Sequence, residues 1–391
     1  MKHIHIITAS LTLLTPLLCM AQANDALRHR MEQIAMAASS IEGANVSYPT
    51  MHSDSMLTRH HGINAHGGCI IQVDSTWYWY GENRPEHGFT TEVGVEVYSS
   101  TDLTHWRDEG VALSVSEESG SPIERGCIME RPKVVYNANT GMYVMLFHLE
   151  LKGRGYEAAQ VGFATSNTPC GPFQFVQALR PNAGLWPQNL TDEDIEIAKS
   201  LNESDYPQGW TTEWRQAVIQ GLYLKRDLNG GQMSRDQTIF IDDDTRAYQI
   251  TSSEENLTLD INELTEDYLG FTGRYWRVAP CDQNEAPTIL KHGGKYWLIC
   301  SGCTGWAPNE ARMYQADSIT GPWTRMPSPM RGKGAEKTFG GQGTWILNTG
   351  TEYIFMADQW NPRHLSYSRH LWLPITFDPD GTPIIYNENN N

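Results

Sequence analysis

Short aromatic-rich segments recur along most of the chain, each bounded by polar residues. Five such cores are Trp77–Tyr80, Tyr143–Phe147, Ala247–Ile250, Tyr296–Ile299 and Tyr353–Met356. Four of them follow a turn-type pair, namely Asp74-Ser75, Thr140-Gly141, Gly293-Gly294 and Thr349-Gly350. Turn residues followed by aromatic and β-branched residues are typical of β-strands entered from tight turns. The pattern therefore predicts an all-β chain built from five similar units.

The spacing of these cores is that of a repeat. Tyr78 and the tyrosines at positions 143, 248, 296 and 353 lie 65, 105, 48 and 57 residues apart. A propeller blade commonly takes roughly 40–50 residues or a little more. A Ser-rich turn that ends on an aromatic residue follows several cores, in Ser99–Trp106, Ser166–Phe173 and Asp317–Trp323. We interpret each of these as the outer strand pair of a blade, and we expect the strand His370–Asp378 to close the ring against the first blade.

The long interval of 105 residues contains an insertion of about residues 186–235, between the second and third repeats. Thr191 and Asp194 form a capping-box pattern before a helix that carries Ile195, Ile197, Ala198 and Leu201. A second helix is predicted over about 212–222. The two helices could shape the mouth of a cleft or only pack on the rim, and the sequence leaves both open.

The first 23 residues have the features of a secretory signal peptide. A charged start precedes an apolar stretch from Ile4 to Met20, and Ala21-Gln22-Ala23 has the small-x-small pattern of a signal-peptide cleavage site. The stretch is short for a membrane span and Pro16 interrupts it, which disfavours a membrane anchor or buried helix. We expect cleavage near Ala23 and a secreted or periplasmic protein. Residues 24–60 would then be a lead-in with a short helix over 25–38, and residues 61–391 the propeller.

The net charge of −17 comes without any basic patch. Nucleic acid and anionic membrane surfaces are therefore excluded as expected partners. An uncharged polysaccharide or oligosaccharide is compatible with this charge, although the charge could serve solubility alone. We expect a monomer.

Removing the leader leaves six cysteines, at positions 69, 127, 170, 281, 300 and 303. Export permits disulfides, and six cysteines allow 15 pairings. Cys300 and Cys303 form one C-x-x-C without the further ligands that zinc needs. Asp242-Asp243-Asp244 lacks the alternating spacing of a calcium loop and is predicted to be a β-turn. We therefore expect free thiols or one disulfide, no metal and no cofactor; a structural calcium is not indicated.

Several acids stand where inner strands of the repeats should begin or end. They are Glu82, Glu130, Asp236, Glu254, Glu255 and Glu285. A single acid beside a strand is usually a solvated surface residue, but equivalent positions in successive blades focus such groups on one axis. Two facing groups, one a protonated carboxyl, are what glycoside hydrolysis needs. His66 is another inward candidate, either for a sugar hydroxyl or as a core histidine, while Trp306 and Trp360 could be stacking platforms.

These motifs resemble glycoside hydrolase family 43 and, within it, the galactan 1,3-β-galactosidase (exo-β-1,3-galactanase) branch. The resemblance covers roughly residues 60–380 and implies a five-bladed β-propeller. It is carried by Ile63-Asn-Ala-His-Gly-Gly, Tyr80-Gly-Glu, Ile128-Met-Glu-Arg-Pro-Lys-Val, Phe147-His-Leu-Glu-Leu-Lys-Gly, Arg180-Pro-Asn-Ala-Gly, Ser252-Ser-Glu-Glu-Asn, Glu285-Ala-Pro, Ser301-Gly-Cys-Thr-Gly-Trp-Ala-Pro-Asn and Met356-Ala-Asp-Gln-Trp-Asn-Pro.

The resemblance also implies roles for individual residues. Glu285 matches the general acid, and Asp236 matches the acid that orients it and tunes its pKa. Glu130 and Arg131 match a sugar-binding pair, with Glu82, Tyr156, Asn256 and Thr304 as further contacts. A general acid must hold a proton near neutral pH, so burial or a neighbouring anion has to raise the pKa of Glu285.

The chain departs from the wider family at the general base. Most members place an Asp at the start of the first blade, where this chain has Asn64-Ala-His-Gly. The galactanase branch shows the same loss, and Gln342 matches the residue that takes the place of the base there. An amide is a very poor proton acceptor, so we expect Gln342 to position the attacking water and leave proton acceptance open. Family members invert anomeric configuration, which implies a gap of roughly 6.5–9.5 Å between acid and water-activating group.

The resemblance thus implies release of galactose from β-1,3-galactan. Two alternatives stay open at this stage. One is another family 43 specificity, such as arabinofuranosidase or galactofuranosidase. The other is a glycan-binding propeller that has lost its base and its activity.

Overall fold

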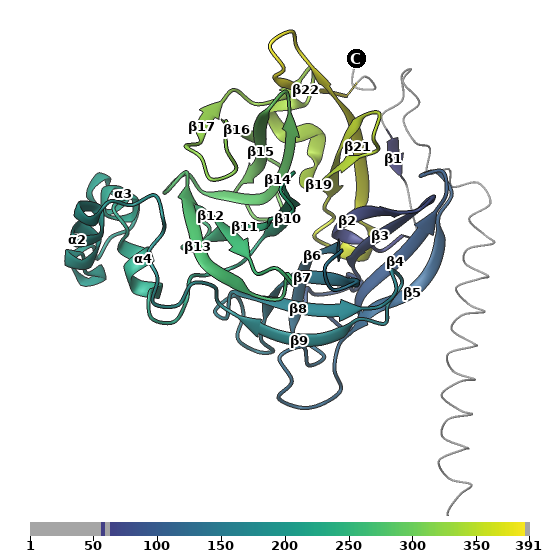
Figure 1. The fold of residues 1–391 in the computed structure, drawn as a ribbon, viewed down its shortest axis with the longest axis horizontal. Helices are drawn as coiled ribbons and strands as arrows, with labels where there is room; N and C mark the ends of the chain where they lie inside the picture. The colour runs from purple at the N-terminus through teal and green to yellow at the C-terminus, as the bar shows by residue number, and fades with distance from the viewer. Residues whose placement is uncertain (1–55, 59–62, 388–391) are drawn as a thin grey trace, which may run out of the picture. The chain divides into compact units, whose positions relative to one another are not determined.

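The computed structural model describes residues 56–58 and 63–387, which belong to one compact unit. Five sheets are arranged in a ring, and the order of the sheets follows the chain (Figure 1). All strand pairs within them are antiparallel except the parallel pair of β18 (Met330–Arg331) with β22 (Pro383–Tyr386) in the described residues. The predicted five-bladed β-propeller is confirmed. The predicted leader (1–23) and the predicted helix over 25–38 lie outside the described residues. No helix in the described part of the chain is both long and apolar enough to cross a membrane.

The first four blades have four strands each, and the chain enters each blade at its innermost strand. Blade 1 comprises β2 (His66–Val73), β3 (Thr76–Glu82), β4 (Gly94–Ser100) and β5 (Arg107–Ser114); blade 2 comprises β6 (Ile128–Asn137), β7 (Met142–Glu150), β8 (Gln160–Ser166) and β9 (Gln174–Leu179). Blade 3 comprises β10 (Gln237–Ile241), β11 (Ala247–Ser253), β12 (Thr258–Leu264) and β13 (Phe271–Val278); blade 4 comprises β14 (Asn284–His292), β15 (Lys295–Gly302), β16 (Arg312–Ala316) and β17 (Thr324–Met326).

The five aromatic cores of the sequence are the second strands of the five blades, β3, β7, β11, β15 and β20 (Tyr353–Gln359). The turns before them require left-handed backbone: Asp74 has a φ of 54°, and Gly293 and Gly294 have φ values of 60° and 76°. Glycine adopts this conformation at little cost, which explains the Gly-Gly pair. The three Ser-rich motifs are the turns β4–β5, β8–β9 and β16–β17, so the predicted outer strand pairs are confirmed.

Blade 5 is built differently from the others. Its strand order is β18 (Met330–Arg331), β22 (Pro383–Tyr386), β21 (Arg369–Phe377), β20 and β19 (Gln342–Asn348), and β1 (Met56–Thr58) pairs antiparallel with β21. The predicted closing strand His370–Asp378 is therefore not the last strand but the third strand of blade 5. It meets blade 1 through side chains, with the ring centroids of Trp372 and Trp79 5.0 Å apart. The hydrogen-bonded closure comes from β1, which precedes blade 1 in the chain.

The hydrophobic core is divided among the five interfaces between blades. Each of five buried clusters combines residues from two neighbouring blades, including the interface of blade 5 with blade 1. Burial of apolar surface between neighbours holds the ring together. All six cysteines of the described residues are free thiols, so the alternative of one disulfide is not realised.

The insertion forms α2 (Asp192–Ser200), a 3₁₀ turn (Glu203–Asp205), α3 (Thr212–Ile219) and α4 (Leu222–Asp227) between blades 2 and 3. The predicted capping box at Thr191 is present. The second predicted helix, over about 212–222, is interrupted, because Gly221 adopts a φ of 103°. The apolar faces of these helices pack with Leu257 and Cys281, in the loops of blade 3 and after it.

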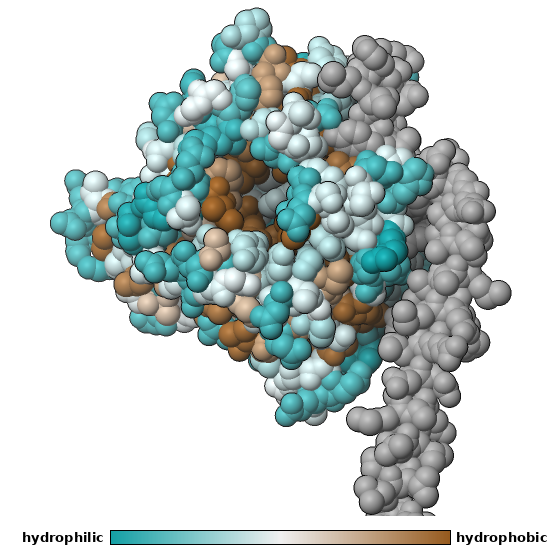
Figure 2. Space-filling view, turned by 45° about the vertical axis from the view of Figure 1, so that its right-hand side comes forward, coloured by the Kyte–Doolittle hydropathy of each residue, from teal (hydrophilic) through white to brown (hydrophobic). Residues whose placement is uncertain are grey.

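The two ends of the propeller axis differ in chemistry. The far ends of the inner strands enclose a cavity of about 660 Å³ whose lining is mostly aliphatic and aromatic. Figure 2 shows a hollow with a hydrophobic floor in one face of the molecule. Charged and amide side chains gather instead at the starts of the inner strands, where the candidate site lies.

Candidate active site

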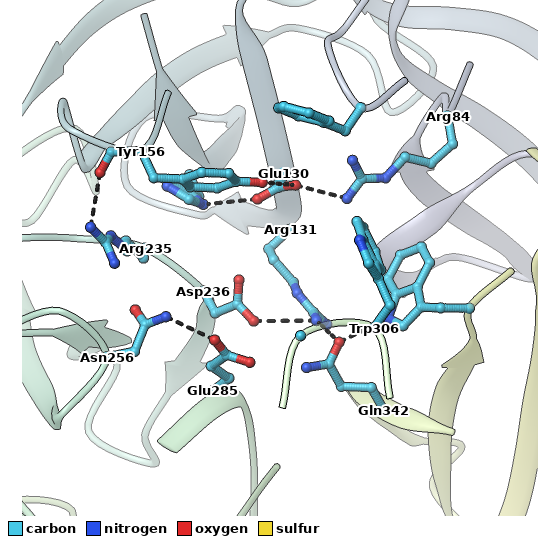
Figure 3. Close-up of a pocket in the computed structure, with 14 residues that line it drawn as sticks. Arg84, Glu130, Arg131, Tyr156, Arg235, Asp236, Asn256, Glu285, Trp306 and Gln342 are labelled. Carbon is cyan, nitrogen blue, oxygen red and sulfur yellow. Dashed lines mark hydrogen bonds and ion pairs between the residues drawn. The ribbon is translucent and has the colours of Figure 1, made fainter. Parts of the chain in front are cut away.

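A cavity of about 440 Å³ opens where the inner strands begin. Glu130 and Arg131 lie near the start of β6, Asp236 directly before β10, Glu285 at the second residue of β14 and Gln342 at the first residue of β19. Four of the five blades thus direct a polar side chain into one cavity (Figure 3). Of the six acids predicted at the ends of inner strands, Glu130, Asp236 and Glu285 line this cavity, whereas Glu82, Glu254 and Glu255 do not.

Most of the predicted site residues line this cavity. They are Glu130, Arg131, Tyr156, Asp236, Asn256, Glu285, Trp306, Gln342 and Trp360. The sequence interpretation missed five further lining residues, Arg84, Phe89, His148, Arg235 and Gly305. One signal could have identified His148: it stands directly opposite Glu130 in the β6–β7 register, so it shares the position of an inner-strand acid.

The local backbone of β14 aims Glu285 into the cavity. A register shift separates Glu285 from Thr288, and Ala286 has a φ of 51°. The Asn256 side chain donates a hydrogen bond of 2.8 Å to Glu285 Oε1. The backbone N–H of Ala286 donates to Asp236 Oδ2 at 3.0 Å, which fixes the neighbouring carboxylate beside Glu285.

Burial, followed by the nearby anion of Asp236, raises the pKa of Glu285 to about 7. Arg131, Asn256 and the Cys303 thiol oppose this shift because each favours the ionised carboxylate. Glu285 therefore holds its proton over much of the range below neutral pH. This is the property required of a general acid.

Arg131 connects the two sides of the cavity. Its Nη2 lies 3.2 Å from Asp236 Oδ2 and donates to Gln342 Oε1 at 2.7 Å (Figure 3). Its Nη1 donates to the carbonyl of Gly343 at 2.9 Å. The guanidinium is buried and the residue has a φ of 52°. A residue held in this backbone conformation without being glycine is costly and is common at functional sites.

The orientation of the Gln342 amide follows from the chemistry of its neighbours. Besides Arg131, the indole N–H of Trp360 donates to Oε1 at 2.8 Å. Both groups can only donate, so the atom that faces them must be the amide oxygen. The amide nitrogen donates to Ser301 Oγ at 3.0 Å. The oxygen is thus fully occupied, and one N–H remains for another acceptor.

Glu130 is the centre of a second polar cluster. Its Oε1 accepts from Arg84 at 2.9 Å and from the Tyr156 hydroxyl at 3.1 Å, and its Oε2 lies 3.3 Å from His148 Nδ1. Burial alone would raise the pKa of Glu130, but Arg84 and His148 outweigh it and hold that pKa below its ordinary value. Burial opposes protonation of His148, yet Glu130 and Glu150 raise its pKa to about 9. At neutral pH this cluster contains ionised Glu130 beside two cations.

Three predicted site residues do not line the cavity. Glu82 is buried, with its Oε2 2.9 Å from Arg84 Nη2, and burial raises its pKa to about 8 despite that cation. His66 is fully buried, with its Nδ1 3.2 Å from Asp358 Oδ1, and burial lowers its pKa to about 4.

Thr304 is exposed on the β15–β16 loop, and its hydroxyl donates to the carbonyl of Ala307 at 2.6 Å. The roles of Glu82, His66 and Thr304 in binding substrate stay predictions.

Aromatic side chains flank the opening of the cavity. Trp306 is 39% exposed and packs edge-on against Trp360, with their centroids 5.3 Å apart. The guanidinium of Arg84 lies over both rings. On the other side, the rings of Phe89 and Tyr156 are stacked with centroids 6.5 Å apart. These faces are suited to the apolar faces of sugar rings.

The chain is similar to known glycoside hydrolases. The family profile "Glycosyl hydrolases family 43" matches residues 202–383. A comparison with curated proteins found no match. Among solved structures, a family 43 β-1,3-galactosidase with galactodeoxynojirimycin is 52% identical, with a TM-score of 0.81, over 83% of this chain and 94% of that one.

Two exo-β-1,3-galactanases are more distant. The enzyme of Phanerochaete chrysosporium, solved with galactose, is 31% identical with a TM-score of 0.66, over 87% of this chain and 66% of its own. The enzyme of Clostridium thermocellum is 30% identical with a TM-score of 0.66, over 88% of this chain and 65% of its own. The chain belongs to glycoside hydrolase family 43 and is a β-1,3-galactosidase-like glycoside hydrolase.

Proposed function

We propose that this protein is a secreted, inverting hydrolase that releases galactose from the non-reducing end of β-1,3-galactan. The observation that carries the proposal is the pair formed by Glu285 and Gln342 in one cavity, the former with a pKa raised to about 7. The relatives solved with galactodeoxynojirimycin and with galactose support galactose as the sugar bound here. Export rests on the leader predicted over residues 1–23.

Glu285 acts as the general acid. Its carboxyl gives a proton to the glycosidic oxygen as the bond from that oxygen to the anomeric carbon breaks. The neighbouring Asp236 anion favours the protonated form of Glu285, because ionising Glu285 would add a second negative charge beside it. Asn256 orients the carboxyl through its 2.8 Å hydrogen bond.

Gln342 positions the water rather than accepting its proton. An imidic-acid form would place a proton on Oε1, where Arg131 and Trp360 both already donate. The remaining N–H can hold a water oxygen on the opposite side of the sugar from Glu285. The water adds to the anomeric carbon, its surplus proton passes to solvent, and Glu285 regains a proton from solvent. Bond breaking and bond making then occur on opposite faces, which inverts the configuration.

Substrate recognition is divided between the two sides of the cavity. Ionised Glu130 accepts hydrogen bonds and the Arg84 guanidinium donates them, so together they suit the hydroxyls of a terminal galactose. The exposed faces of Trp306 and Phe89 suit the next sugar unit at the opening.

The test is hydrolysis of β-1,3-galactobiose. We expect galactose release by the parent protein and a loss of at least ~10³-fold in Glu285→Gln, which keeps shape but cannot donate a proton. Glu310→Gln, at an exposed acid on the loop of the same blade, is the matched control and should retain activity. Proton NMR of the first product should show α-galactose.

Other outcomes would redirect the proposal. Turnover of 4-nitrophenyl arabinofuranoside alone would indicate a related family 43 specificity. Binding of galactobiose without turnover would indicate a glycan-binding propeller. Export is tested separately, by N-terminal sequencing of protein recovered outside the cytoplasm, where we expect a start near Asn24.

A further inference from the structure

The turn between β11 and β12 has an unusual backbone. Glu254, Glu255 and Asn256 have consecutive φ values of 50°, 58° and 62°, and none of them is glycine. This conformation is costly for each non-glycine residue, and a run of three persists only when its surroundings hold it in place. The third of these residues is the one that donates to Glu285 Oε1.

Arg277 of β13 holds the first residue of the turn. Its Nε and Nη2 donate to the two carboxylate oxygens of Glu254 at 2.6 and 2.8 Å. Glu254 is fully buried and the side chain of Arg277 is 3% exposed. A bidentate pair of this kind fixes both distance and orientation.

The same guanidinium is anchored in the helical insertion. Arg277 donates through Nη2 to the carbonyl of Val218 and through Nη1 to that of Ile219, each at 3.0 Å. These are the last two residues of α3, where the helix dipole attracts a cation; the Val218 carbonyl also accepts from the backbone N–H of Gly221 at 3.0 Å. The Asn189 side chain adds two hydrogen bonds to the Arg277 backbone.

The insertion also packs directly on the turn. Leu257, the residue after Asn256, lies in the apolar cluster formed by Trp214 and Leu222 of the insertion. On the outer side, the Glu255 carboxylate pairs with Arg226 of α4 at 3.2 Å. The turn is therefore held by helices that contribute no residue to the lining of the cavity.

We propose that Glu254 and Arg277 are positioning residues that clamp the β11–β12 turn to the helical insertion and thereby hold Asn256 against the general acid. The proposal rests on the proposed role of Glu285. It gives the insertion a function, where the sequence left open whether the helices only pack on the rim.

The sign of the expected effect separates positioning from simple electrostatics. Asn256 stabilises the ionised form of Glu285, so losing this hydrogen bond raises the pKa of Glu285 and moves the alkaline limb of activity upward. Removing the negative charge of Glu254 would by itself lower that pKa and move the limb downward. The charged and thiol groups that face Glu285 from other elements, Asp236, Arg131 and Cys303, are untouched by these changes.

Two variants test the clamp. Glu254→Gln keeps an acceptor for Arg277 but loses the charged pair, and Arg277→Lys keeps the charge but cannot reach the carboxylate and both helix carbonyls together. Asn256→Ala is the reference for complete loss of the contact. Glu266→Gln is the control, because Glu266 is an exposed acid in the β12–β13 turn of the same blade and does not line the cavity.

We expect kcat on β-1,3-galactobiose to fall about tenfold in both clamp variants. Their alkaline limb should move upward, in the same direction as in Asn256→Ala, and Glu266→Gln should match the parent. A downward shift in Glu254→Gln, or a parental profile in Arg277→Lys, would overturn the proposal.

Crystal structures of the variants provide a readout that does not depend on activity. We expect the distance from Asn256 Nδ2 to Glu285 Oε1 to exceed hydrogen-bond range while the five blades stay superimposable. An unmoved Asn256 in both variants would overturn the clamp even if the parent had no galactosidase activity, whereas an inactive parent with a displaced Asn256 would count against the proposed function alone.

Discussion

Replacing Asp236 with Asn tests how the general acid is kept protonated. Burial raises the pKa of Glu285 most, and the Asp236 anion contributes next; the substitution removes this anion. It leaves an oxygen to accept from the Ala286 N–H, so the backbone contact at 3.0 Å can persist. The cation of Arg131, which Asp236 partly balances at 3.2 Å, would then act on Glu285 with less opposition.

The direction and size of the effect follow from these contacts. In the parent protein the pKa of Glu285 is about 7, so about half of the molecules hold the catalytic proton at pH 7. Loss of one neighbouring charge lowers such a pKa by about one unit, or about 1.4 kcal/mol. The protonated fraction at pH 7 would fall to about a tenth, a roughly fivefold loss of activity that disappears near pH 5.

The assay is the pH dependence of kcat/KM for β-1,3-galactobiose between pH 4 and 9. We expect the alkaline limb to lie near pH 7 in the parent and about one unit lower in Asp236→Asn. A pH-independent loss can accompany the shift, since Arg131 loses a charged partner. An equal loss at every pH, with the limb unmoved, would show that Asp236 does not tune the acid.

The remaining predictions concern stability, water positioning and substrate binding. The pKa of Glu285 is raised from about 4.5 in an unfolded chain to about 7 in the fold. Its ionisation therefore lowers the stability of the fold progressively from about pH 4.5 to pH 7, fully above pH 7 and not at all below about pH 4.5. Glu285→Gln should therefore raise the free energy of unfolding at pH 8 by at most about 3 kcal/mol. Calorimetry should show a higher Tm than the parent at pH 8 and the same Tm at pH 4.5. Gln342→Ala should lower kcat about 100-fold or more with little change in KM, measured by steady-state kinetics; a parental kcat would rule out a role in holding water. Arg131→Lys should lower kcat by ~10- to 100-fold, since an ammonium cannot reach both Asp236 and Gln342; unchanged kinetics would contradict the bridge. Trp306→Ala should raise KM about fivefold and leave the pH limb in place, and a shifted limb would contradict a pure binding role.

The blade architecture could be predicted because its cause is local. Alternating aromatic residues after tight turns specify a strand and its partner without reference to the rest of the chain. Closure of the ring could not be predicted in the same way. The strand β1 pairs with β21 across more than 300 residues, and nothing in three residues of sequence specifies a partner so far away. Gly221 was also missed, since a glycine near a helix end can either continue or stop the helix.

The site was predictable where a residue's own position determines its direction. Glu130 and Glu285 lie near the start of an inner strand and Asp236 directly before one, and the propeller brings such positions together. Gln342, the first residue of β19, was indicated by the family resemblance alone. Arg84 and Phe89 lie on a loop, where sequence gives no direction. His66 illustrates the converse: it stands at the start of β2, yet its ring is turned toward Asp358 and His370 and away from the cavity.

Asn64 lies in the first-blade stretch Asn64-Ala-His-Gly, which by resemblance matches the region where most family members carry the base. Its Nδ2 donates to the Arg84 carbonyl at 2.8 Å, and its Oδ1 accepts from the Arg84 N–H at 2.9 Å. Both ends of the amide are needed for this reciprocal pair, since a carboxylate could accept but not donate. Asn64 therefore braces the backbone of the residue whose guanidinium holds Glu130 at 2.9 Å. Asn64 thus supports Arg84 instead of supplying a base, and the proposed function assigns the positioning of water to Gln342 of blade 5.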